Sequence, residues 1–336
     1  MNETLNAIAY ESGWTDSIVT AEAYAIEGAV VTTLAGTAGN TGSADGTGSA
    51  AQFNAPYGIA TDGTNLYVAD TENYTIRKIV ISTGAVTTLA GSPGLAGSAD
   101  GTGGGARFNA PMGISVSGSN LYVADSQNYT IRKIAISTGA VTTLAGSAGL
   151  CGGADGTGSA ARFWQPMGIT TDGTNLYVTD CWGAVRKIVI STGVVTTLAS
   201  PFYGLMGIAF SGSNLYVVDG CAIRKIVIST ATVTTLAGGG TFGNIDGTGS
   251  AAAFDAPQGI ATDGTNLYVT DSTTYTIRKI VISSALVTTM AGSAYTYGGS
   301  DGTGYGATFW GISGVASYGT NLYVADYNNC TIRKVH

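Results

Sequence analysis

Carboxylate and guanidinium groups recur in this sequence at fixed places. Six segments of the form L-Y-V-x-D each end in an aspartate, and an Arg-Lys pair follows five to seven residues later. A carboxylate accepts hydrogen bonds from the forked guanidinium group, so we expect one structural Asp–Arg pair per segment, formed between neighbouring units. The six aspartates are Asp70, Asp125, Asp180, Asp219, Asp271 and Asp326.

A second set of aspartates heads five D-G-T-G segments. These are Asp45, Asp100, Asp155, Asp246 and Asp301. Calcium takes oxygen ligands from carboxylates and carbonyls in glycine-rich loops, so each segment is a weak candidate for a calcium site. Each segment brings only one carboxylate, whereas dedicated calcium loops bring several. We therefore expect these aspartates to cap the turn, or the short helical turn that follows, and we predict no cofactor.

Histidine occurs once, as the last residue His336. A serine or cysteine nucleophile activated by histidine would depend on that residue, and the count excludes a zinc site built from several histidines. The sequence therefore predicts a protein that is not an enzyme. A metal-dependent hydrolase or lyase that uses the acidic loops is the alternative within the enzyme class.

A long internal repeat positions these aspartates. The strand-ending aspartates are 55, 55, 39, 52 and 55 residues apart, which indicates six units with a shortened fourth unit. Each unit contains four short apolar runs separated by turn sequences such as T-D-G-T-N and S-T-G. The alternation of β-branched and polar residues in these runs predicts four antiparallel strands per unit.

The two ends of the chain complement each other. Val30–Ala35 reads as a fourth strand with no unit before it, and Thr331–Val335 reads as a third strand with no fourth strand after it. Pairing them in one sheet would remove two open edges. We therefore predict an all-β, six-bladed β-propeller of four-stranded antiparallel blades over residues 28–336, closed by pairing Val30–Ala35 with the C-terminal blade.

The repeat also resembles a known family. Ala90–Ile134, with the sequence AGSPGLAGSADGTGGGARFNAPMGISVSGSNLYVADSQNYTIRKI, is similar to the NHL repeat in its bacterial, extracellular form. This resemblance implies a six-bladed propeller whose blades are built from the innermost strand to the outermost.

Residues 1–27 lie outside the repeat. They carry five acidic and no basic residues, suit a short helix or a strand, and are predicted to form an ordered arm.

Differences between the units gather on one face of the predicted ring. In an up-and-down blade, the turn from the second to the third strand and the connection to the next blade emerge on the same side. Both of these segments vary between units, so we call this side the varied face. The residue before each first-strand glycine changes through Tyr57, Met112, Met167, Met206, Gln258 and Ser313, and the aromatic residues Trp164, Trp182, Tyr203 and Trp310 stand nearby.

These methionine and aromatic side chains allow two interpretations. They suit adaptable contacts with a partner, or they close the central channel and cap the ends of the blades.

Four cysteines fall on the same face, namely Cys151, Cys181, Cys221 and Cys330. A disulfide of Cys181 with Cys221 or Cys151 is expected if the chain is extracellular. The charge-poor, Thr/Ser/Gly-rich composition favours an extracellular or cell-surface location, although the N-terminus does not read as a signal peptide.

Charge excludes some partners. The net charge is −7, and 12 of the 14 basic residues belong to the six Arg-Lys pairs, which leaves no basic patch for nucleic acid. No apolar run is long enough to insert across a bilayer. We therefore predict a non-enzymatic module whose varied face binds a protein or a glycan. The alternative from another class is a structural subunit that self-associates through residues 1–27 into an oligomer or an extracellular filament.

Overall fold

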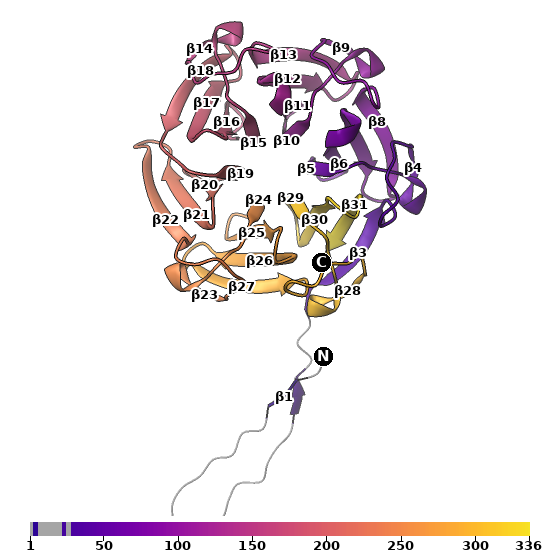
Figure 1. Cartoon of the computed structure of the whole chain (residues 1–336), viewed down its shortest axis with the longest axis vertical. Coiled ribbons are helices and arrows are strands. Elements are labelled where there is room, and N and C mark those ends of the chain that lie inside the picture. The colour runs from indigo at the N-terminus through magenta and orange to yellow at the C-terminus, as the bar shows by residue number, and fades with distance from the viewer. Residues whose placement is uncertain (1–2, 6–21, 25–27) are drawn as a thin grey trace, which may run out of the picture.

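The computed structural model describes residues 3–5, 22–24 and 28–336. The described residues form a ring of six β-sheet blades around a central axis (Figure 1), so the predicted six-bladed β-propeller is confirmed. The predicted ordered arm lies almost wholly outside the described residues. Within it, β1 (Glu3–Leu5) and β2 (Glu22–Tyr24) form an antiparallel pair.

Each blade has four antiparallel strands, and their order in the chain goes from the innermost strand at the axis to the outermost strand at the rim. Blade 1 contains β5 (Pro56–Thr61), β6 (Asn65–Asp70), β7 (Thr75–Val80) and β8 (Ala85–Gly91). Blade 2 contains β10 (Pro111–Ser117), β11 (Asn120–Asp125), β12 (Thr130–Ala135) and β13 (Ala140–Gly146). Blade 3 contains β15 (Pro166–Thr171), β16 (Asn175–Asp180), β17 (Ala184–Val189) and β18 (Val194–Ala199).

The remaining three blades follow the same order. Blade 4 contains β19 (Leu205–Ser211), β20 (Asn214–Asp219), β21 (Ala222–Val227) and β22 (Thr232–Gly238). Blade 5 contains β24 (Pro257–Thr262), β25 (Asn266–Asp271), β26 (Thr276–Val281) and β27 (Leu286–Ala291). Blade 6 contains β29 (Ile312–Tyr318), β30 (Asn321–Asp326), β31 (Thr331–Val335) and β3 (Val30–Ala35).

Blade 6 combines strands from the two ends of the described ring. β3 pairs antiparallel with β31, with Val31 opposite Val335 and Thr33 opposite Arg333. The ladder extends by two backbone hydrogen bonds between Val30 and His336, at 2.8 and 3.0 Å. Backbone pairing of these segments therefore closes the ring, and β3 covers the outer hydrogen-bonding edge of β31.

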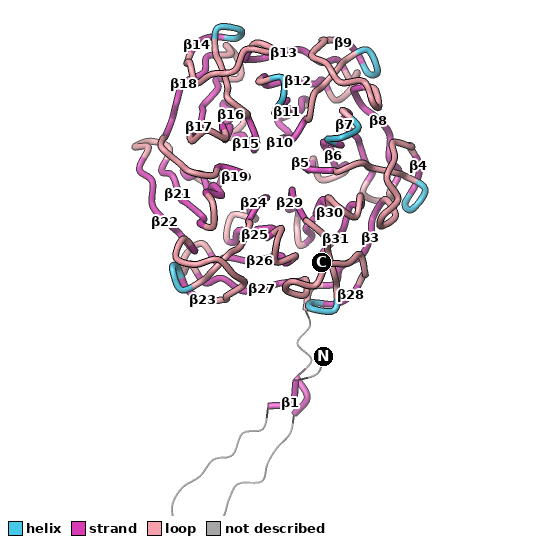
Figure 2. The backbone as a smooth tube through the Cα atoms, in the orientation of Figure 1, coloured by secondary structure: helices cyan, strands magenta, loops and turns pink. Residues whose placement is uncertain are grey.

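A short fifth strand at the rim was not predicted. The strands concerned are β4 (Gly46–Thr47), β9 (Gly101–Thr102), β14 (Gly156–Thr157), β23 (Gly247–Thr248) and β28 (Gly302–Thr303), in blades 1, 2, 3, 5 and 6. Each pairs with the outermost strand of its blade. The 3-10 helices that follow them lie at the rim (Figure 2) and are η1 (Gly48–Ala50), η3 (Gly103–Gly105), η5 (Gly158–Ala160), η6 (Gly249–Ala251) and η7 (Gly304–Gly306).

Two further 3-10 helices occupy turns between the second and third strands. They are η2 (Thr71–Asn73) in blade 1 and η4 (Ser126–Asn128) in blade 2. Each ends at a tyrosine in the left-handed backbone region, Tyr74 with a φ of 57° and Tyr129 with a φ of 59°. These tight turns bring the third strand back beside the second.

The apolar core is divided among the six interfaces between neighbouring blades. Between blades 1 and 2, for example, Phe108 is fully buried with Ile76 of blade 1 and Leu121 of blade 2. Burying a side chain of this size contributes about 1.5–3 kcal/mol. Because each interface repeats the same residue types, the alternation seen in the sequence directly determines how the blades stack.

Glycine in each innermost strand is required by a close approach between blades. A Cβ atom on Gly113 would lie 2.2 Å from the carbonyl oxygen of Met167 in the next blade, and one on Gly207 would lie 2.6 Å from that of Gln258. Such distances are far below van der Waals contact. The glycine thus lets the innermost strands converge tightly around the axis.

The Asp–Arg pairs form within a blade, so the expected pairing between blades is wrong. In blade 2, Arg132 is fully buried and donates to Asp125 at 2.8 Å through Nη1 and to Asp100 at 2.8 Å through Nη2. The guanidinium group lies over the Phe108 ring, 5.2 Å from its centroid. The connection that enters the blade supplies both Asp100 and Phe108, so it completes the environment of the arginine.

Candidate binding face

The varied face lies at the end of each blade where the first strand begins and the second strand ends. Pro56 pairs with Asp70 there, and the register then shifts before Ile59 pairs with Val68. The shift is a β-bulge over the two residues after the first residue of the strand, and it recurs in all six blades, with Leu205 and Ile312 in place of the proline in blades 4 and 6. A bulge redirects a side chain, which places the varied residue before each glycine at the mouth of the channel.

Tyr57 reaches across this mouth to blades 4 and 5. Its hydroxyl donates a hydrogen bond of 2.7 Å to Oε1 of Gln258 in blade 5, and the hydroxyl also lies 3.9 Å from Sδ of Met206 in blade 4. Burial raises the pKa of Tyr57, and nearby Tyr327 and Cys181 raise it further, so the hydroxyl stays protonated and donates. The interpretation of these three varied residues as a channel plug therefore has direct geometric support.

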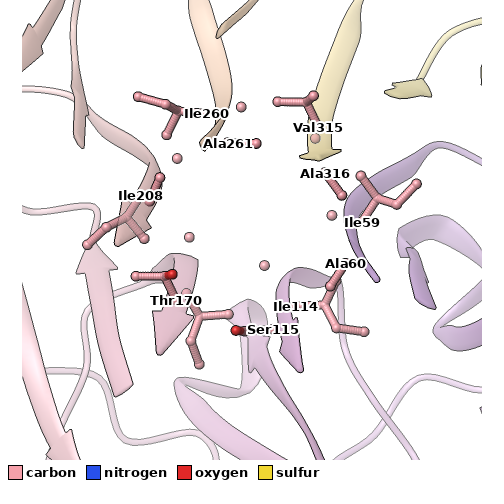
Figure 3. Close-up of a pocket in the computed structure, with 18 of the residues that line it drawn as sticks. Ile59, Ala60, Ile114, Ser115, Thr170, Ile208, Ile260, Ala261, Val315 and Ala316 are labelled. Atoms are coloured by element: carbon pink, nitrogen blue, oxygen red, sulfur yellow. The ribbon is translucent and has the colours of Figure 1, made fainter. Parts of the chain in front are cut away.

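Below this plug lies the central channel, with a volume of about 320 Å³. Residues of the innermost strand of every blade line it, and Figure 3 shows Ala60, Ser115, Thr170, Ala261 and Ala316 among them. The lining is uncharged and combines small residues with isoleucine, methionine and aromatic side chains. It therefore offers hydroxyl and backbone groups but no acid–base pair to a molecule within it.

The outer part of the varied face carries exposed aromatic residues. Trp164 and Trp182 of blade 3 lie with ring centroids 5.8 Å apart, and Trp182 is 76% exposed. Tyr203, in the connection to blade 4, is 93% exposed. The amide of Phe202 donates to the carbonyl of Gly183 at 3.1 Å, which brings the two segments side by side. Three of the predicted aromatic residues thus come from neighbouring segments at the junction of blades 3 and 4.

A second aromatic group lies at the junction of blades 5 and 6. Trp310 is 41% exposed, and its ring centroid lies 5.6 Å from that of Tyr297. Tyr297 in turn makes an edge contact with Tyr275 at 6.4 Å. Neither tyrosine was among the predicted site residues. Tyr297 could have been found from the sequence, because only this connection carries a Y-T-Y segment, in place of residues such as G-L-A in other units.

Between this second group and the axis there is a hollow of about 290 Å³. The predicted residues Tyr57, Met112 and Gln258 line it together with Tyr327, which was also missed. Tyr327 stands directly after a strand-ending aspartate, where the other units have a small residue. The remaining predicted residue, Met167, is 7% exposed and lines the channel, so it offers little surface to a partner.

All four cysteines are free thiols, so the predicted disulfide of Cys181 with Cys221 or Cys151 is not formed. Burial raises the pKa of Cys181, and the neighbouring Asp180 raises it further. Cys330 is buried, and burial likewise raises its pKa. A raised pKa keeps these thiols protonated at neutral pH, which makes them weak nucleophiles.

The five calcium candidates already have a cationic neighbour. Asp45 and its four counterparts each accept a hydrogen bond from a buried arginine at 2.7–2.9 Å. Each carboxylate also accepts from a threonine of the outermost strand, as Asp45 does from Thr88. These aspartates therefore join the rim segment to the blade, and the expected capping of their own turn is wrong. Among the described residues, no three His, Cys, Asp or Glu side chains gather as a metal site.

Fold and repeat together define a six-bladed β-propeller, and the comparisons with known proteins show that its sequence is similar to that of NHL-repeat proteins. SUPPRESSOR OF QUENCHING 1, a chloroplastic protein of Arabidopsis thaliana, is 29% identical over 316 residues, which cover 89% of this chain and 26% of that protein. Human NHL repeat-containing protein 2 is 28% identical over 321 residues, which cover 88% of this chain and 40% of that protein. The resemblance to the NHL-repeat propeller family is confirmed. No family model matches the chain.

The chain spans less than half the length of these two curated relatives. Among solved structures, a Bacteroides thetaiotaomicron protein of unknown function matches 95% of this chain and 78% of its own, with a TM-score of 0.74 and 21% identity. An auxiliary nutrient binding protein of the same species matches 95% of this chain and 79% of its own, with a TM-score of 0.72 and 18% identity. At such identities the match establishes the fold. The bacterial, extracellular form of the repeat stays a prediction.

In the part of the chain that the structure describes, no helix is long and apolar enough to cross a membrane.

Proposed function

We propose that this propeller is a non-enzymatic binding module that holds a protein or glycan partner on its varied face. Propellers with the same fold include a protein described as nutrient binding, which agrees with a binding role. The proposal places the contact on the outer aromatic residues Trp164, Trp182, Tyr203 and Trp310. The plug residues Tyr57, Met206 and Gln258 support the floor of that surface.

The observation that carries this proposal is the exposure of aromatic rings in contacting pairs. Exposed aromatic side chains that already pack against one another lose little conformational freedom when a partner covers them. Tryptophan and tyrosine are also the residues most often responsible for binding energy at interfaces. The opposite face instead repeats the turns T-D-G-T-N and S-T-G between units, so it presents few features specific to one partner.

The absence of catalytic groups on the varied face supports a binding role over catalysis. The single histidine, His336, lies at the outer ladder of blade 6, where its backbone pairs with Val30. The thiols of Cys181 and Cys330 have raised pKa values. The aspartates that end the second strands accept hydrogen bonds from backbone amides, as Asp180 does from the amides of Trp164 and Gln165.

An extracellular or cell-surface location stays part of the proposal. Its support is the charge-poor composition, with 10% charged residues and 51 glycines. Free thiols are compatible with either a reducing or an oxidising compartment, because only Cys151 is exposed and the other three are partly or fully buried.

Tryptophan fluorescence provides a direct test, because three of the four tryptophans lie on the varied face and the fourth is Trp14. The Trp14→Phe protein would be titrated with a panel of soluble glycans and purified candidate proteins. For any partner that changes the emission, Trp164→Ala and Trp310→Ala should weaken binding about tenfold or more, measured by calorimetry.

Tyr318→Ala is the matched control, since Tyr318 is an exposed aromatic residue at the far end of β29, on the opposite face. It should leave the affinity unchanged. A partner that binds the two tryptophan variants with wild-type affinity would refute the assignment of the face.

A further inference from the structure

The outer edge of blade 4 differs from that of every other blade. In blades 1, 2, 3, 5 and 6, a two-residue rim strand pairs with the outermost strand, whereas blade 4 is a four-stranded sheet that ends at β22. In Figure 1, β22 forms the rim alone. Among the described residues, therefore, the outer hydrogen-bonding edge of β22 has no strand partner.

Blade 2 shows what a rim segment contributes. The Asp100 carboxylate accepts hydrogen bonds from Arg132 Nη2 at 2.8 Å, from the hydroxyl of Thr143 at 3.0 Å and from the amide of Thr143 at 3.2 Å. Gly101 and Thr102 then pair with Val141 and Ala140 of β13. The segment D-G-T thus supplies one carboxylate and two residues of β-strand.

Blade 4 keeps the receiving groups and lacks the segment. Arg224 stands opposite Thr235 in the ladder, as Arg132 stands opposite Thr143. The side chain of Arg224 is 32% exposed, and its nearest carboxylate is that of Asp219 at 3.9 Å. Nη1 of Arg224 donates to the hydroxyl of Thr235. In the other five blades, the arginine and the threonine both donate hydrogen bonds to an aspartate. In blade 4 the arginine instead donates to the threonine hydroxyl.

We propose that the outer edge of blade 4 binds an extended segment of a partner protein that carries an aspartate followed by small residues, as in D-G-T. The aspartate would accept hydrogen bonds from Arg224 and Thr235, and the residues after it would add a strand to β22. Strand addition supplies affinity through backbone hydrogen bonds, and the charge pair supplies register and selectivity.

Five internal copies support this choice of ligand. Asp45, Asp100, Asp155, Asp246 and Asp301 occupy the equivalent position in the other blades. These five aspartates are already paired within their own blades, so none of them is available to blade 4. Thr232, Thr234 and Thr235 of β22 are exposed, which leaves the edge accessible. This rim site is separate from the varied face and does not depend on the function proposed for it.

A peptide from the protein itself is a suitable probe. The peptide SADGTGGGARF, which is residues 98–108, would be titrated against the full 336-residue chain by calorimetry or fluorescence anisotropy. We expect saturable binding below about 1 mM. The same peptide with Asp100→Asn should bind at least about tenfold more weakly, because the charge-assisted hydrogen bonds are lost.

Variants of the protein locate the site. Arg224→Gln should weaken peptide binding about tenfold or more, and Thr235→Val, which keeps the shape of the side chain, should weaken it several-fold. Lys225→Gln removes the same charge from the neighbouring residue and should leave binding unchanged. Circular dichroism verifies the fold of each variant. Binding that is absent at about 1 mM, that is equal for the Asp and Asn peptides, or that survives Arg224→Gln in the folded protein would overturn the proposal.

Discussion

Blades 2 and 4 share their four strands and differ in one connection. Residues 92–110 join β8 to β10 around the rim of blade 2, whereas Ser200–Gly204 joins β18 directly to β19 of blade 4. In blade 2 the arginine is fully buried between two carboxylates and a phenylalanine ring. In blade 4 the equivalent arginine is partly exposed and 3.9 Å from a single carboxylate.

The comparison shows that a blade does not need its rim segment to form. Phe202 of the short connection is buried in the cluster between blades 3 and 4, so the core of that interface is still filled. What is lost is the cover over the arginine and over the outer edge of β22. The same short connection carries the exposed Tyr203 on the varied face. Shortening one connection therefore changes the surface in two places while the ring persists.

The largest expected effect contrasts the two arginines. Arg132→Gln leaves Asp125 and Asp100 without their shared cation, and Asp125 is fully buried. Losing one partner of a buried ion pair costs about 3–5 kcal/mol of the free energy of unfolding. Arg224→Gln removes a partly exposed, loosely paired group and should cost no more than about 1 kcal/mol.

Urea unfolding followed by circular dichroism measures both values. Equal losses for the two variants would show that the rim connection does not determine how strongly the arginine contributes to stability. Lys133→Gln, next to Arg132, controls for the change in net charge.

A smaller effect separates blades 4 and 5 at the turn between their first two strands. In blade 5, the Asp263 carboxylate accepts hydrogen bonds from the amides of Thr265 at 2.8 Å and Asn266 at 2.6 Å and from the hydroxyl of Tyr268 at 2.8 Å. Partial burial raises the pKa of Asp263, but hydrogen bonds from Asn266, Thr265 and Tyr268 outweigh it and lower the pKa to about 2. Blade 4 has Ser211 at the corresponding turn.

A pKa lowered on folding stabilises the protein above the unfolded value of about 3.9, and the stabilisation is lost as the pH falls through about 2. Asp263→Asn should therefore lower the free energy of unfolding by about 1 kcal/mol or less at pH 7, because the group is largely exposed, and by almost nothing near pH 2. Ser211→Ala should show a difference that does not change with pH. A loss from Asp263→Asn that persists near pH 2 would contradict the account.

The fold followed from the sequence because the repeat fixes the number of blades and the alternation fixes their inner and outer faces. The complementary ends, Val30–Ala35 and Thr331–Val335, also pair as expected from their sequences. The rim strands could not be predicted, since two residues such as Gly101 and Thr102 are too short to give a strand pattern. Their partner lies some forty residues later in the chain, and sequence spacing gives no such register.

The site was predicted less completely. The position of the varied residue before each glycine indicated the channel mouth, but not that Tyr57 would reach across it to Gln258, 201 residues away. The direction of the Tyr57 side chain depends on the β-bulge between Pro56 and Ile59 and on the length of the tyrosine side chain. Exposure of Trp164, Trp182, Tyr203 and Trp310 agrees with their place on the varied face, and their role in binding stays a prediction.

The central claim is that the repeat is structural and that departures from it create binding surface. Replacing Ser200–Gly204 by residues 91–110, which are Gly91 at the end of β8 and the connection that enters blade 2, tests this claim most directly in a single variant. The account predicts a higher urea midpoint than in the wild type, because Arg224 gains a carboxylate and cover, together with complete loss of binding of the 98–108 peptide. An unchanged midpoint with undiminished peptide binding would contradict it.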